Sequence, residues 1–85
     1  DLYDMNTKIK VKQRISLRKS RTDEKTAFYL EPGENAVILA SDDKEWCLVQ
    51  NSKGKKGWFA VESYDTIRGT EKRACEFFDG VCYAD

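Results

Sequence analysis

Histidine is missing from the 85-residue sequence, and this absence narrows the chemistry open to the chain. Without an imidazole, the side chain that most often acts as a general base, activates a cysteine or ligates a metal is lacking. Most hydrolase mechanisms are thereby excluded. The acids Asp42, Asp43 and Glu45 cluster in one polar turn, but in an exposed turn they do not predict an acid–base or metal site. We therefore expect a protein that is not an enzyme and holds no metal or cofactor.

Cysteine is scarce as well. Cys47, Cys75 and Cys82 are an odd number and lack the C-x-x-C spacing of zinc and redox sites. We expect structural thiols, whose replacement changes stability only. A Cys75–Cys82 disulfide stays open: a hairpin turning at Asp79-Gly80 would separate the two residues along a diagonal of about 7–8 Å, beyond comfortable bridging distance, whereas a helical turn would relax this constraint.

The sequence has no long apolar run. No stretch approaches the roughly 18 apolar residues of a membrane helix, and residues 1–5 lack the charged-then-apolar order of a signal peptide. We expect no membrane insertion. Because the chain opens at Asp1 rather than Met, we also expect it to be a piece of a longer protein whose leader lies upstream.

Net charge is zero, yet the charges are unevenly distributed along the chain. Seven Lys or Arg and no acid lie between Met5 and Thr22, whereas residues 31–50 hold five acids and one Lys. Such blocks either steer a charged partner or form solvated faces, and the solvated face is the default. A chain of this size forms one domain at most, because it buries only roughly 60% of its unfolded surface.

Short apolar stretches between turn signals predict an all-β fold. Residues 7–17 alternate and predict one strand, with Lys8, Lys10, Lys12 and Arg14 on its wet face. An exposed loop is predicted over residues 18–25, and strands over 27–30, 35–40, 45–50 and 57–61, the last two as a hairpin, with a short closing strand at 66–67. The predicted core is Ile9, Val11, Ile15, Leu17, Val37, Leu39, Cys47, Val49 and Phe59.

This pattern predicts a small barrel of about five short strands over residues 1–69. Residues 70–85 are expected to form an extension packed on the barrel. Thr70 offers a helix cap and Asp79-Gly80 a hairpin turn, so we expect a short helical turn followed by a hairpin.

Residues 15–67 resemble the bacterial Src-homology-3-type domain. The resemblance rests on the order of four stretches: Ile15-Ser16-Leu17-Arg18-Lys19-Ser20, Leu30-Glu31-Pro32-Gly33, Trp46-Cys47-Leu48-Val49 and Gly57-Trp58-Phe59. Ser20-Arg21 stands where that family usually has Gly-Pro, so strand order is predicted better than loop conformation. The resemblance implies an SH3-like barrel.

By this resemblance, Trp46 and Tyr64 would line a ligand groove, with the loop acids Asp23 and Glu24 facing them. Aromatic platforms of this kind suit a cell-wall polymer or a peptide or protein partner rather than a small-molecule substrate. The resemblance implies a binding module outside the cytoplasm, at the cell surface or secreted. The alternative for the two aromatic residues is that they seal one end of the barrel; Trp58 is expected in the core.

The basic stripe of Lys8, Lys10, Lys12 and Arg14 has two interpretations. It contacts an anionic polymer, or its lysines guard an edge strand against aggregation, which is the interpretation we favour. An intracellular adaptor or nucleic-acid-binding barrel is the alternative function, but zero net charge and the acidic middle make nucleic acid an unlikely partner.

Overall fold

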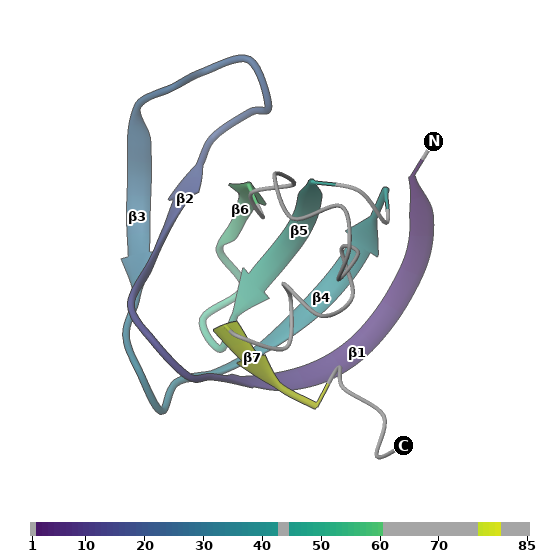
Figure 1. Ribbon diagram of the computed structural model, residues 1–85, viewed down its shortest axis with the longest axis vertical. Helices are drawn as coiled ribbons and strands as arrows, with labels where there is room; N and C mark the ends of the chain where they lie inside the picture. The colour runs from purple at the N-terminus through teal and green to yellow at the C-terminus, as the bar shows by residue number, and fades with distance from the viewer. Residues whose placement is uncertain (1, 43–44, 61–76, 81–85) are drawn as a thin grey trace, which may run out of the picture.

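The computed structural model describes residues 2–42, 45–60 and 77–80, which form one curled antiparallel sheet (Figure 1). The strands are β1 (Tyr3–Val11), β2 (Ile15–Arg18), β3 (Thr26–Leu30), β4 (Asn35–Ser41), β5 (Trp46–Asn51), β6 (Lys56–Ala60) and β7 (Phe78–Asp79). Their order across the sheet is β3-β2-β6-β5-β4-β1-β7. The predicted all-β, barrel-like fold is confirmed, and the described residues contribute seven strands to it.

The strand predicted over residues 7–17 is in fact two strands, because the chain changes partners on the way. β1 begins earlier, at Tyr3, and pairs with β4, whereas β2 pairs with β3 and meets β6. At the end of β1 the N–H of Val11 donates to the carbonyl of Glu34 at 2.9 Å, and the N–H of Gly33 donates to the carbonyl of Val11 at 2.8 Å. These bonds hold the chain at the corner between β1 and β2.

The alternation of residues 7–17 survives this break. Ile9, Val11, Ile15 and Leu17 are all at most 4% exposed, while the lysines between them are exposed. The buried core also includes Leu30, Ala36, Ile38, Cys47, Val49, Phe59 and Phe78. One concave face of the sheet is therefore apolar throughout.

In β4 the prediction that Val37 and Leu39 belong to the core was wrong, because the neighbouring residues face the core instead. Ala36, Ile38 and Ala40 are buried, and the predicted Val37 and Leu39 are half-buried on the opposite face. The register explains the difference, because Ile38 pairs with the buried Val49 of β5. Side chains alternate along a strand, so that pairing turns Val37 and Leu39 outward.

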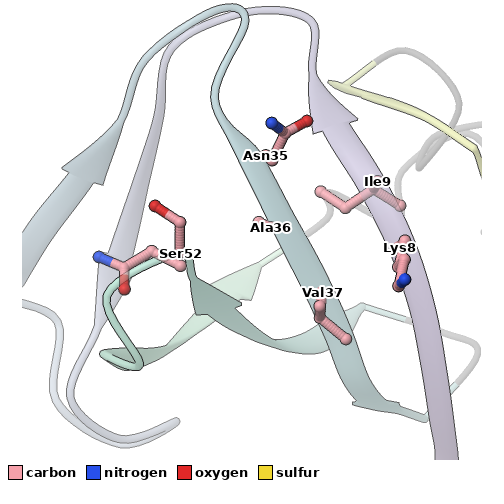
Figure 2. A pocket seen from close by; sticks show the side chains of 7 residues that line it. Lys8, Ile9, Asn35, Ala36, Val37 and Ser52 are labelled. Atoms are coloured by element: carbon pink, nitrogen blue, oxygen red, sulfur yellow. The ribbon is translucent and has the colours of Figure 1, made fainter.

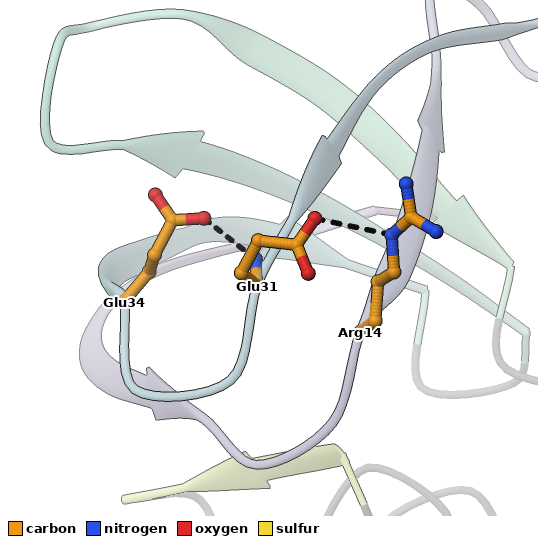
Figure 3. Close-up of polar contacts among 3 residues, drawn as sticks. All are labelled: Arg14, Glu31 and Glu34. Carbon is orange, nitrogen blue, oxygen red and sulfur yellow. Dashed lines mark hydrogen bonds and ion pairs between the residues drawn. The ribbon is translucent and has the colours of Figure 1, made fainter.

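A tight turn connects β3 to β4 through Pro32 and Gly33. Gly33 has a φ of +92°, and the N–H of Glu34 donates to the carbonyl of Glu31 at 3.1 Å, as in a type II turn. Figure 3 shows two further bonds: the Glu34 carboxylate accepts from the Glu31 N–H at 2.6 Å, and Arg14 Nε donates to the Glu31 carboxylate at 3.1 Å. Side chains as exposed as Arg14 and Glu31 form an ion pair that contributes little to stability.

The predicted β5–β6 hairpin is confirmed, with Val49 opposite Gly57 and Leu48 opposite Trp58. Asn51 closes the turn, since its carboxamide oxygen accepts from the N–H groups of Lys53 and Lys55 at 3.0 and 2.8 Å.

At its other edge the sheet gains β7, which pairs with the end of β1. Phe78 is fully buried, and its ring meets that of Phe59 edge-on with centroids 5.5 Å apart. The predicted helical turn, the closing strand at 66–67, the hairpin beyond Gly80, the boundary at residue 69 and the Cys75–Cys82 pair lie outside the described residues. No helix in the described part of the chain is long and apolar enough to cross a membrane.

Candidate binding surface

Trp46 opens β5 and is fixed by the turn that precedes it. The Asp42 carboxylate accepts from the N–H groups of Glu45 and Trp46, both at 3.0 Å, and the N–H of Asp42 donates to the carbonyl of Trp46 at 3.2 Å. The neighbours of Trp46 within β5, Cys47 and Val49, point into the core. The indole of Trp46 therefore lies on the outer, convex face, where it is half-buried.

Trp58 lies on the same outer face, one strand away. In the hairpin, Trp46 pairs with Ala60 and Trp58 pairs with Leu48, so the two indoles are diagonal neighbours. Gly57 and Phe59 take the core-facing positions of β6, and Trp58 is half-buried. The prediction that Trp58 belongs to the core was wrong.

Two arginines cover these indoles. Arg18 ends β2, directly opposite Trp58, and its guanidinium carbon lies 5.4 Å from the ring centroid of Trp46. Arg21 follows in the β2–β3 loop, and its guanidinium carbon lies 5.1 Å from the ring centroid of Trp58. Both distances are within the range of a cation–π interaction. We call Trp46, Trp58, Arg18 and Arg21 the Trp–Arg surface.

Two apolar side chains adjoin the tryptophans of the Trp–Arg surface. Leu48 and Ala60, the cross-strand partners of the two tryptophans, are half-buried on the same face. Arg18 is half-buried and Arg21 is exposed. The surface thus combines flat apolar area with two permanent positive charges.

The predicted loop acids are exposed near this surface, but their observed contacts stay within the loop. The Asp23 carboxylate accepts from the N–H of Lys25 at 3.0 Å, and the N–H of Asp23 donates to the hydroxyl of Ser20 at 3.2 Å. Glu24 is exposed in the same loop. Among described residues, the side chains that the loop and its flanking strand place over the tryptophans are arginines. Tyr64 lies outside the described residues, so the groove pairing with Trp46 stays a prediction.

All four residues of the basic stripe are exposed. Lys8 and Lys10 pair with Val37 and Asn35 of β4, whereas Arg14 lies in the connection to β2. Arg14 binds Glu31, and its guanidinium carbon lies 4.0 Å from the ring centroid of Tyr29. The stripe is therefore divided between β1, which carries Lys8 and Lys10, and the connection to β2, which carries Lys12 and Arg14.

An open pocket of about 220 Å³ lies beside Lys8, and neither tryptophan lines it (Figure 2). It is lined by Lys8, Ile9, Asn35, Ala36, Val37, Asn51 and Ser52. Lys8 is its one charged lining residue, and no group of three or more potential metal ligands occurs among the described residues. The pocket therefore has fewer charged and aromatic side chains for binding a ligand than the Trp–Arg surface.

The sequence pointed to Trp46 as a candidate site residue but not to Arg18 or Arg21, and it placed Trp58 in the core. For Trp58 a usable signal exists: a hairpin that turns around residues 51–55 places Leu48 opposite Trp58 and hence both tryptophans on one face. For Arg18 and Arg21 no comparable signal exists, because the loop conformation decides where these side chains lie.

Comparison with known proteins adds no assignment to this geometry. No protein-family model matches the chain, and no curated protein or solved structure matches it either.

Proposed function

We propose that this domain is a non-catalytic binding module that recognises a cell-wall polymer or a peptide partner through the Trp–Arg surface. The observation that carries the proposal is the pair of neighbouring, half-buried tryptophans on the outside of the sheet. The resemblance to bacterial Src-homology-3-type domains supports the same conclusion and favours a role within a larger surface or secreted protein.

The position of the tryptophans favours binding over a purely structural role. The concave core is already filled by residues such as Leu17, Ile38 and Phe59, and the indoles stand outside it. The part of each indole that stays accessible forgoes a burial gain of roughly 25 cal/mol per Å². Trp and Arg side chains are enriched where proteins bind partners.

The proposal is tested by retention on insoluble purified cell walls. Trp46→Ala should weaken retention by about 1–3 kcal/mol, the usual loss for an aromatic hot spot. Tyr29→Ala is the matched control, because Tyr29 is likewise an aromatic residue under an arginine, but on β3. The control should bind like the wild type.

Retention is measured at low and at raised salt, with the unfolding midpoint of each variant as a check on folding. Salt weakens exposed electrostatic contacts more than aromatic ones. Equal retention of wild type and Trp46→Ala at low salt, with both released at raised salt, would contradict the proposal. It would indicate that exposed charges, such as those of Lys8 and Lys10 on β1, hold the ligand in place of Trp46.

A further inference from the structure

The two arginines of the Trp–Arg surface differ from Arg14 in their electrostatic surroundings. Arg14 donates to the Glu31 carboxylate at 3.1 Å. Arg18 and Arg21 make no ion pair in the described part of the chain, and their observed partners are the indole rings. A cation over an aromatic face keeps its full charge, so the surface attracts anions.

No hydrogen bond from either guanidinium to another described residue accompanies these ring contacts. A guanidinium carries five N–H donors in its own plane and accepts no hydrogen bond. An indole ring carries no oxygen acceptor for these N–H groups, so they stay able to donate to a ligand. Such a group is suited to bind a carboxylate through two parallel hydrogen bonds.

The apolar side chains of the surface indicate which kind of anionic ligand fits it. Beside the guanidinium groups lie the half-buried indoles and the side chains of Leu48 and Ala60. A polyol-phosphate polymer such as a teichoic acid offers charges but little apolar area to cover these groups, and zero net charge argues against a nucleic acid. A peptide segment offers both, since carboxylates and aliphatic or aromatic side chains can alternate along one chain.

We infer that the Trp–Arg surface binds an acidic peptide segment. Its carboxylates accept hydrogen bonds from Arg18 and Arg21, and its apolar side chains contact Trp46 and Trp58. The inference rests on the proposed function and adds the sign of the ligand's charge. That sign is opposite to the one expected if Asp23 and Glu24 faced the tryptophans.

The test is selection from a displayed random-peptide library on the whole chain, followed by affinity measurements on selected peptides. Selected sequences should be enriched in Asp and Glu beside apolar residues. Replacing the acids of a selected peptide by Asn or Gln, and replacing Arg18 or Arg21 by Gln, should each weaken binding about tenfold, the worth of a charge-assisted hydrogen bond.

Lys19→Gln is the matched control, because Lys19 is an exposed cation between the two arginines. It should change affinity less than about twofold if the arginine contacts are specific. Arg18→Lys and Arg21→Lys keep the charge and the packing of the side-chain stem but lose the planar fork, and should fall between wild type and the Gln variants. They also serve if a Gln variant fails to fold.

Each outcome discriminates. Selected peptides without acidic enrichment whose binding still needs Trp46 and Trp58 would overturn the inference and leave the proposed function standing. Peptides that bind independently of both tryptophans would overturn both. An equal effect of Lys19→Gln, or equally tight arginine-dependent binding of a teichoic acid or single-stranded nucleic acid, would overturn the choice of a peptide ligand.

Discussion

Basic side chains of this domain repeatedly lie over aromatic rings. In the described residues, Arg14, Arg18 and Arg21 cover Tyr29, Trp46 and Trp58, and Lys55 lies 4.8 Å from the ring centroid of Phe28. Contacts of this kind contribute about 0.5–1 kcal/mol each at exposed sites. Variants of Arg18 and Arg21 should therefore stay folded, which makes them suitable for binding experiments.

At the same scale, Gly57 is predicted to tolerate no side chain without strain, because the side chains of Leu17 and Phe28 approach its backbone. A Cβ built on Gly57 would lie 2.7 Å from Cβ of Leu17 and 2.8 Å from a ring carbon of Phe28. Leu17 is fully buried and cannot move outward. Gly57→Ala should therefore lower the free energy of unfolding by about 1–3 kcal/mol, as overpacking does, measured by urea denaturation.

Gly33→Asn is the control for that measurement. Gly33 also has a special role, with its φ of +92°, but no atom lies within 4 Å of its built Cβ. Asn tolerates a positive φ better than other residues with a side chain. The control should lose less stability than Gly57→Ala, and a Gly57→Ala protein as stable as wild type would show that β2 and β6 do not pack this closely.

At the scale of the element, a second stability test asks which side chains of β4 face the core. Ile38 is 1% exposed and Leu39 is half-buried on the outer face. Ile38→Ala should cost about 2–5 kcal/mol, since it leaves a cavity in the core. Leu39→Ala removes a side chain of the same size and should cost at least about 1 kcal/mol less. Thermal or urea unfolding of the pair checks this, and a reversed order would mean that the strand is flipped.

A comparison of β4 with residues 7–17 shows which buried positions the sequence can predict. Residues 7–17 largely alternate between apolar and polar side chains, so their buried face could be predicted although the strand is interrupted between Val11 and Ile15. Residues 36–40 are all apolar and therefore carry no alternation. Their phase is decided by pairing with β1 and β5, which involves residues distant in sequence.

The candidate surface divides in the same way. The outward direction of Trp46 follows from alternation within one strand, and that of Trp58 from the hairpin that joins β5 to β6. The positions of Arg18 and Arg21 depend on the pairing of β2 with β6 and on the β2–β3 loop. The alternation of apolar and polar residues along a strand predicts neither the pairing of β2 with β6 nor the conformation of the β2–β3 loop.

At the scale of the whole molecule, the curled sheet divides the basic N-terminal part of the chain between two places. Arg18 and Arg21 reach the tryptophans of β5 and β6, whereas Lys8 and Lys10 stand on β1, with β4 and β5 between β1 and β6. Zero net charge thus conceals separate groups of basic side chains among the described residues. An anionic ligand could bind at the Trp–Arg surface or at the lysines of β1. Of these two, the Trp–Arg surface has the indole rings that add apolar contacts.

The most direct test of the account is therefore to locate the bound ligand by NMR. The chain is labelled with ¹⁵N and titrated with an acidic peptide from the selection or with soluble cell-wall fragments. We predict that the indole N–H signals of Trp46 and Trp58 and the Nε–H signals of Arg18 and Arg21 shift most, saturating together. Shifts confined to the backbone of β1 around Lys8 and Lys10, with both indole signals unmoved at saturation, would contradict the claim that the Trp–Arg surface is the binding site.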